Sequence, residues 1–137
     1  MDKVLRTTSA NGKLCSRRSG RSSSWITKVR RLAIYLRDGF ACAYCGTDLS
    51  AGSPRDIGLD HLTPRVRGGG HESSNLVTAC SACNFGRQDK PWTRFATDGA
   101  VQRIKRLRRR QPNVALARAI LSGAVDRQTA LAEAQRG

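Results

Sequence analysis

Apolar side chains recur at helical spacing in the first patterned stretch of the chain, between residues 25 and 38. Ser24 is a suitable N-cap for this stretch, and Asp38-Gly39 is a typical helix stop. The pattern predicts an amphipathic helix that packs on the following chain. Its basic side chains are expected to face solvent or a ligand: Lys28, Arg30, Arg31 and Arg37.

A short strand-like run follows at residues 57–61, after a loop rich in turn-forming residues. Residues 64–67 are the candidate antiparallel partner of this strand, and the three glycines at 68–70 form a turn. Beyond Cys83, the sequence predicts a helix of about two turns that ends before Pro91.

The last third of the chain is helical in pattern. Residues 99–110 carry an apolar residue at every third position, and residues 114–121 and 124–135 are rich in Ala and Leu. Residues 1–24 have few apolar positions, which favours disorder. We therefore expect a disordered basic arm at 1–24, a main domain at 25–98 and a basic helical extension at 99–137.

Charge divides the chain in a similar way. The net charge is +15, and segments 1–31, 32–98 and 99–137 contribute +8, 0 and +7. The isoelectric point near 11.2 indicates a polyanionic partner. A GC-rich genome would also enrich arginine without any function.

Membrane insertion and secretion are not expected. No apolar run approaches the roughly 18 residues of a membrane span, and the first residues are polar and basic. The expected location is the cytoplasm, with no membrane partner.

Two CxxC pairs, Cys42/Cys45 and Cys80/Cys83, are separated by 34 residues. Two such knuckles supply four thiolates to one tetrahedral zinc ion, a closed site that stabilises the fold and does not catalyse. Buried free thiols or disulfides are the alternative. Cys15 is left over and is interpreted as an incidental free thiol.

A second group of residues could carry chemistry. Asp60 and His61 end the predicted strand, and Asn75 and Asn84 follow later in the sequence. A carboxylate and an amide oxygen can hold a hard divalent ion, and a neutral imidazole beside them can accept a proton from water. A lone histidine is, however, more often an ordinary surface or core residue.

These motifs together resemble the HNH endonuclease family. The resemblance runs from Arg37 through the first CxxC knuckle, Leu59-Asp60-His61, Gly68-Gly69 and Asn75-Leu76-Val77 to Cys80-Ser81-Ala82-Cys83-Asn84 and Lys90. It implies a small α+β fold, the ββα-metal motif, pinned by a zinc site of four cysteines. Domain 25–98 would then be the nuclease domain.

The resemblance also implies roles for single residues. His61 resembles the general base, Asp60 the metal-binding carboxylate, and Asn75 the middle asparagine that holds the loop and orients the histidine ring. Asn84 stands where the family has its final histidine, so the chain resembles an HNN variant. The amide oxygen favours Mg²⁺ or Mn²⁺ as the catalytic ion.

The implied activity is hydrolysis of phosphodiester bonds in double-stranded DNA, leaving 5′-phosphate and 3′-hydroxyl ends. The candidate DNA contacts are Arg65, Arg67, Arg87, Arg103, Lys105, Arg106, Arg108, Arg109 and Arg110. Each is also a candidate for an ordinary solvated charge.

Two other interpretations stay open. One is a non-catalytic zinc module that binds DNA, and the other is a packaging accessory protein whose C-terminal helices bind a protein partner. Small HNH proteins of this type occur in phages and bacteria, which predicts a bacterial host cell.

Overall fold

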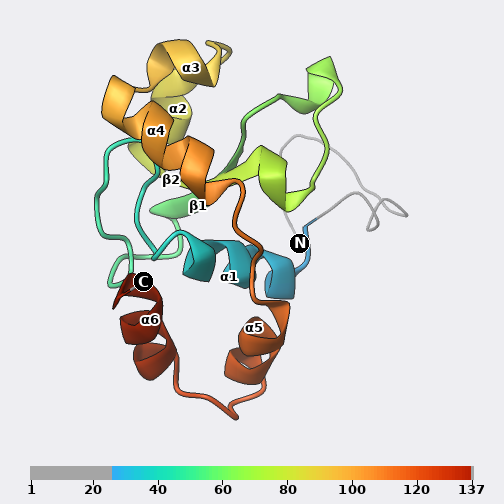
Figure 1. The fold of residues 1–137 in the computed structure, drawn as a ribbon, viewed down its shortest axis with the longest axis vertical. Helices are drawn as coiled ribbons and strands as arrows, with labels where there is room; N and C mark the ends of the chain where they lie inside the picture. Colours follow the sequence, from blue (N-terminus) through green and yellow to red (C-terminus); the bar gives the residue numbers. More distant parts are fainter. Residues whose placement is uncertain (1–25, 137) are drawn as a thin grey trace, which may run out of the picture.

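A two-stranded antiparallel hairpin lies at the centre of the protein in its computed structural model (Figure 1). The structure describes residues 26–136, so the predicted arm at 1–24, with Ser24 and Cys15, lies outside the described residues. Strand β1 (Ile57–His61) pairs with β2 (Leu76–Cys80), with His61 opposite Leu76 and Ile57 opposite Cys80. Helix α2 (Ser81–Arg87) follows β2 directly, so the protein has a small α+β fold.

The predicted strand at residues 64–67 is wrong. Residues Arg65–Arg67 form a short 3-10 helix, η2, and a second one, η3 (Ser73–Asn75), precedes β2. The loop is closed by Asn75, whose side chain accepts from the Thr63 amide (2.8 Å) and donates to the Thr63 carbonyl (3.0 Å). A Cβ at Gly69 would lie 1.7 Å from the Thr63 carbonyl oxygen, so this close approach requires glycine.

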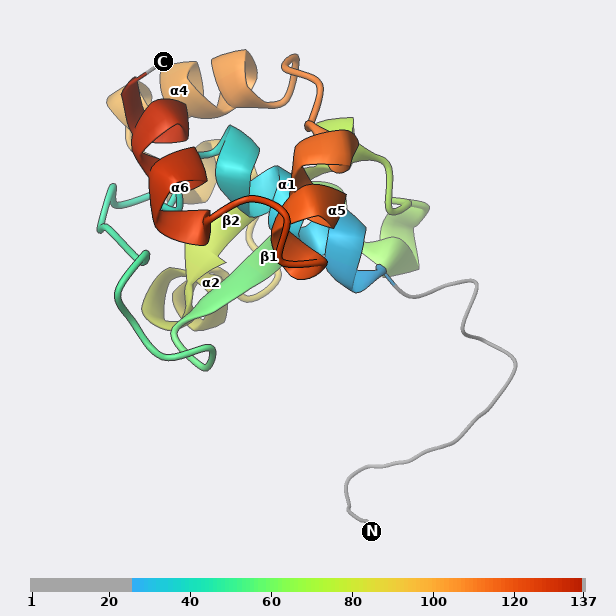
Figure 2. The ribbon, with the colours of Figure 1, turned by 90° about the horizontal axis from the view of Figure 1, so that it is seen from below.

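Helix α1 (Lys28–Arg37) is the amphipathic helix that the pattern predicts, but its N-cap is Thr27, which accepts from the Arg30 amide, and not Ser24. Its apolar face packs on the sheet and on α5 (Figure 2). Arg37, expected to face solvent or a ligand, is buried instead. Its guanidinium pairs with Asp38 (2.7 Å) and donates to the carbonyls of Ser73 and Leu76, while Asp38 accepts from the Thr78 amide. Helix α1 is thereby tied to the strand that follows η3.

The C-terminal helices complete the core. They are α3 (Trp92–Phe95), α4 (Asp98–Leu107), α5 (Val114–Leu121) and α6 (Arg127–Arg136). Ile104 of α4 is fully buried in the cluster around the first CxxC knuckle, and Ala117 of α5 is fully buried against α1. Residues 99–137 were predicted to form an extension, but their helices pack into the body of the protein.

The two faces of the hairpin therefore lie in different surroundings. Val77 and Ala79 point into the cluster that holds the cysteine knuckle and α4, while Leu59 packs against the cluster of α1 and α5. Because side chains alternate along a strand, Asp60 shares the first face and His61 the second. Within residues 26–136, no helix is long and apolar enough to cross a membrane.

Candidate active site

The four cysteines of the two knuckles meet in space. The Sγ atoms of Cys42, Cys45, Cys80 and Cys83 all lie within 4.8 Å of one another, and those of Cys45 and Cys80 are 3.8 Å apart. A tetrahedral zinc with bonds of about 2.3 Å places its sulfurs about 3.8 Å apart. The four sulfurs could therefore hold zinc, as the spacing predicts.

The thiols of this cluster differ in how readily they ionise. Burial raises the pKa of Cys42 and that of Cys83. At Cys45 burial acts in the same direction, but hydrogen bonds from Thr47 and the neighbouring thiols outweigh it and lower the pKa to about 6. Metals bind the thiolate, so the hydrogen bonds around Cys45 favour the form of this thiol that a metal would take.

Tyr44, between the two cysteines of the first knuckle, connects the cluster to the strand. Its hydroxyl donates to Oδ2 of Asp60, and its ring packs edge-on against Phe95 with centroids 5.2 Å apart. Burial and the charge of Asp60 both raise the pKa of Tyr44, so the phenol keeps its proton as a donor. The cysteine knuckle thus positions the Asp60 carboxylate directly.

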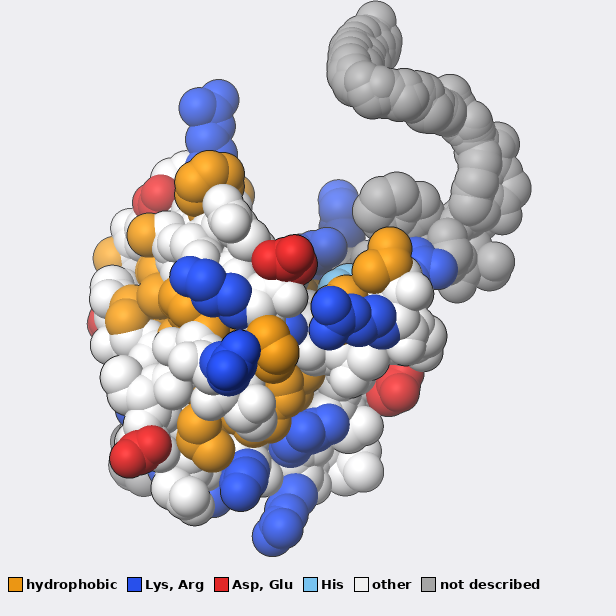
Figure 3. Space-filling model, turned by 90° about the horizontal axis from the view of Figure 1, so that it is seen from above, with side chains coloured by type: hydrophobic (Ala, Val, Ile, Leu, Met, Phe, Trp, Pro, Cys, Tyr) orange, Lys and Arg blue, Asp and Glu red, His pale blue; other side chains and the backbone are white. Residues whose placement is uncertain are grey.

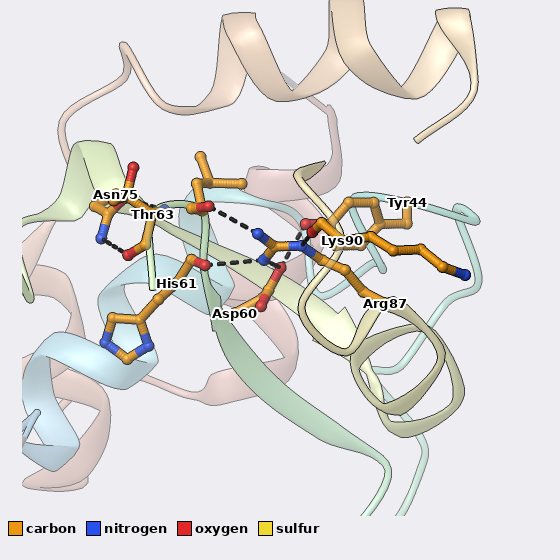
Figure 4. Close-up of polar contacts among 8 residues, drawn as sticks. Tyr44, Asp60, His61, Thr63, Asn75, Arg87 and Lys90 are labelled. Atoms are coloured by element: carbon orange, nitrogen blue, oxygen red, sulfur yellow. Dashed lines mark hydrogen bonds and ion pairs between the residues drawn. The ribbon is translucent and has the colours of Figure 1, made fainter. Parts of the chain in front are cut away.

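Arg87, at the end of α2, is the second partner of Asp60. Its Nη1 lies 2.7 Å from Asp60 Oδ2, and its other N–H groups donate to the carbonyls of His61, Leu62 and Lys90 (Figure 4). The residue is only 3 % exposed. Arg87 was expected at the DNA phosphate, but the structure buries it, because the carbonyls at the end of β1 need donors and the guanidinium supplies them.

Asp60 and Asn84 lie on the same side of β1. Gly58 shares the face of Asp60, and a Cβ built on Gly58 would lie 3.8 Å from Asn84 Nδ2. Within residues 26–136, neither Asp60 Oδ1 nor the Asn84 side chain has a hydrogen-bond partner, and Oδ1 is not fully buried. Carboxylate and amide oxygens are the ligand type that hard divalent ions prefer.

His61 points away from this pair of donors. Its ring lies on the opposite side of β1 from the Asp60 carboxylate (Figure 4). Its Nε2 lies 2.9 Å from Nδ1 of His71. Burial, and next the charge of His71, lower the pKa of His61, which favours the neutral ring.

Part of this arrangement has a counterpart among known protein families. Residues 42–90 match the family model for the HNH endonuclease. The chain contains an HNH endonuclease domain. No curated protein and no solved structure matches the chain.

The HNH domain spans both knuckles, β1, the loop, β2 and α2. Asn75 lies in the loop as the resemblance implies, since it holds Thr63 and also donates to the Gly70 carbonyl (2.9 Å). No hydrogen bond joins Asn75 to the His61 ring among the residues that the structure describes. Its contribution to His61 is therefore through the backbone of the loop.

Apart from the buried Arg87, the basic residues proposed as DNA contacts fall into two groups. Arg103 donates to the carbonyls of Ala43 and Tyr44, and Arg108 donates to the carbonyl of Ser74, so both help to hold the HNH domain together. The others have exposed side chains: Arg65, Arg67, Lys105, Arg106, Arg109 and Arg110.

Two residues of the HNH domain site, Tyr44 and His71, were not found from the sequence, and Arg87 was predicted only in a different role, as a DNA contact. Tyr44 and Arg87 hold Asp60, and His71 contacts His61. His71 follows the three glycines at 68–70, and nothing in the local sequence connects it to His61. The only available signal for Tyr44 was its place inside the CxxC knuckle.

Proposed function

We propose that this protein is a metal-dependent endonuclease that hydrolyses phosphodiester bonds of double-stranded DNA. The observation that carries the proposal is that the polar side chains at the end of β1 lie on two opposite faces of the strand. Two free oxygen donors, Asp60 Oδ1 and the Asn84 amide oxygen, lie on one face, and a neutral histidine lies on the other. HNH family membership supports the nuclease assignment.

This division suits in-line displacement at phosphorus. The attacking water and the leaving 3′ oxygen must lie on opposite sides of the phosphorus atom, as His61 and the Asp60/Asn84 pair lie on opposite sides of the strand. His61 takes the proton of the water, and the products are a 5′-phosphate and a 3′-hydroxyl. A divalent ion on Asp60 and Asn84 would stabilise negative charge on the phosphate and the leaving oxygen.

The exposed cations supply the contact with the DNA backbone. Lys105 and Arg109, with Arg108, line a polar hollow beside Ser74. On the face seen from above, Lys and Arg side chains lie near a small histidine surface, beside which acidic and hydrophobic side chains also lie (Figure 3). We expect Lys105→Gln/Arg109→Gln to weaken binding and to reduce the slope of log affinity against log salt by about 2, since each phosphate contact contributes about 1. Arg118→Gln on α5 is the control for loss of a surface charge.

A supercoiled-plasmid assay tests the nuclease proposal. Wild type and His61→Ala, both loaded with zinc, are incubated with Mg²⁺, with Mn²⁺ and without a second ion, because a chelator could also remove the zinc. Loss of a general base lowers the cleavage rate by about 10²- to 10⁴-fold. Equal rates would remove His61 as the base.

A non-catalytic zinc module that binds DNA is the rival proposal. It predicts binding without cleavage by the zinc-loaded wild type under every metal condition. Asn84→His separates the two further: if Asn84 is a ligand, the imidazole shifts metal preference from Mg²⁺ toward softer ions. A module that does not cleave would show no such shift.

The C-terminal helices also suggest a protein partner. A groove of about 520 Å³ has an apolar floor that includes Leu32, Tyr35 and Ile120, and its basic side chains are Lys28, Arg31 and Arg127. Among residues 26–133, whose side chains are described, none that lines it is acidic, so charge complementarity favours an acidic segment with apolar side chains. A peptide of Glu and Leu should perturb the NMR signals of Ile120, and the Lys/Leu analogue should not; equal effects would refute the proposal.

The cell context follows from the same arguments. We propose a phage or bacterial protein that works in the cytoplasm of the bacterial cell, where thiols stay reduced and zinc knuckles remain intact. The resemblance to small HNH proteins of phages supports this proposal. Detection of the protein in a periplasmic fraction would contradict it.

A further inference from the structure

His71 is held firmly beside His61 although it lies in a glycine-rich loop. Its carbonyl accepts from Arg30 Nη2 of α1 (2.8 Å), and the preceding carbonyl, of Gly70, accepts from the Asn75 amide (2.9 Å). The two imidazole rings are tilted by 54° with centroids 5.0 Å apart. Side chains from two other elements therefore fix the backbone that carries His71.

The two histidines share one hydrogen bond. His61 Nε2 and His71 Nδ1 lie 2.9 Å apart, and in a pair of neutral rings one nitrogen donates and the other accepts. The remaining nitrogen of His71, Nε2, lies 3.3 Å from Nη1 of Arg65 at the protein surface. A group that binds at Arg65 can therefore change which nitrogens of the two histidines carry protons.

Arg65 determines the direction of this hydrogen bond in the free protein. A guanidinium only donates, so His71 Nε2 must accept and His71 Nδ1 must carry the proton. His71 then donates to His61 Nε2, and His61 keeps its proton on Nδ1. Both ring nitrogens of His61 are occupied, and neither can accept a proton from water.

We propose that His71 is a positioning residue that transmits the binding of a DNA phosphate at Arg65 to His61. A phosphate oxygen beside Arg65 accepts from the guanidinium and from His71 Nε2–H. His71 Nδ1 then accepts the proton of His61 Nε2, which leaves a lone pair on His61 Nδ1 for the attacking water. The inference rests on the proposed function.

The change conserves protons. One proton moves from His71 Nδ1 to His61 Nε2, one leaves His61 Nδ1 to solvent, and one is taken up at His71 Nε2. Both rings are neutral before and after. The partly exposed position of the pair gives solvent access for this exchange.

Nitrogen-15 NMR of the zinc-loaded full chain tests the proposal without using cleavage. The chain has only two histidines, so the His71→Asn variant assigns their signals. We expect His61 to be protonated on Nδ1 in the free protein and on Nε2 when a duplex oligonucleotide binds without added Mg²⁺ or Mn²⁺. A His61 ring that stays protonated on Nδ1 in the complex would overturn the proposal.

Kinetics of two variants give the second test. His71→Leu removes the acceptor, whereas His71→Asn places an amide oxygen near the position of Nδ1. We expect kcat to fall by about 10- to 100-fold in His71→Leu, with KM little changed and with most of kcat restored in His71→Asn. Equal losses in both variants would make His71 a merely structural residue.

Failure of the proposed function gives a different result from failure of this inference. A protein that binds the duplex and shifts the His61 tautomer, but never cleaves, would refute nuclease activity and keep the role of His71. A protein that cleaves with an unchanged tautomer would keep the nuclease and refute the role of His71.

Discussion

The two faces of strand β1 differ in how their polar side chains are held. On the Asp60 face, the carboxylate is fixed by Tyr44 from the cysteine knuckle and by the buried Arg87. On the His61 face, the imidazole is only partly buried and meets His71 from an exposed loop. In the proposed function, the Asp60 carboxylate is therefore held in place before an ion binds. His61, the proposed proton acceptor, is held less tightly and can respond to DNA.

Loss of the zinc site should have the largest effect on the two faces of β1. Cys83→Ser removes one of four thiolates, and structural zinc contributes on the order of 10 kcal/mol, comparable to the whole stability of a small domain. We expect unfolding that removes both faces together, since they share β1. Circular dichroism measures the unfolding, and elemental analysis measures the zinc content of the protein.

Cys15→Ser is the matched control, because Cys15 belongs to neither CxxC pair. It should keep the fold and about one zinc per chain. A well-folded, zinc-free Cys83→Ser protein would mean that the fold does not depend on the cluster.

Arg87→Met should damage the Asp60 face next most strongly. It leaves a buried carboxylate without its charge partner, which costs about 3–5 kcal/mol. Urea unfolding measures the loss, and adding Asp60→Asn to Arg87→Met should recover part of it.

The exposed Arg94 on α3 provides the same substitution at the surface. Arg94→Met should change the free energy of unfolding by less than about 0.5 kcal/mol. Similar losses at positions 87 and 94 would argue against the buried ion pair.

Tyr44→Phe removes a single hydrogen bond to Asp60. A bond to a charged group is worth about 1.5–3 kcal/mol, and loss of a group that orients a ligand lowers metal affinity by about 10- to 100-fold. A titration of the nicking rate with Mn²⁺ measures the affinity.

Tyr35→Phe tests whether any buried phenol gives this result, since the Tyr35 hydroxyl meets Arg31 on α1 instead. We expect its Mn²⁺ dependence to match that of wild type. If both variants shift equally, Tyr44 has no special role at Asp60.

The smallest predicted effect concerns His61 and pH. Burial and the charge of His71 lower its pKa, with a smaller contribution from Arg65, while Asp60 and Glu72 act in the opposite direction. The folded state therefore binds this proton less readily than the unfolded state, and stability is lost as pH falls below the unfolded value of about 6.5.

Calorimetry at about pH 7 and pH 5 should show a larger fall in Tm for wild type than for His61→Gln. Protonation of the zinc thiolates affects both proteins alike and cancels in the comparison. An identical fall in the two proteins would refute the shifted pKa.

Parts of the site that depend on spacing could be predicted from the sequence. The matched CxxC pairs predicted the sulfur cluster, and residues 114–121 form the predicted helix. The predicted partner of β1 was wrong. Residues 64–67 have an extended pattern, but they belong to the loop that Asn75 closes, and β1 pairs with β2 after that loop.

The pairing of polar side chains could not be predicted. Arg37, Arg87 and Arg103 were expected at the surface or at DNA, yet each donates to backbone carbonyls far away in the sequence. A count of arginines cannot separate such internal donors from exposed cations. Part of the +15 charge therefore lies inside the fold, and only the exposed remainder is available to the DNA of the proposed function.

The sequence by itself determined the four cysteines that could hold zinc, the HNH motif and most of the helices, because each depends on residues close together in the chain. Only the tertiary structure decided what surrounds Asp60 and His61. Strand alternation sends them to opposite faces, and their partners come from residues 44, 71 and 87. Contacts over such separations depend on how the chain folds back on itself, which local spacing does not specify.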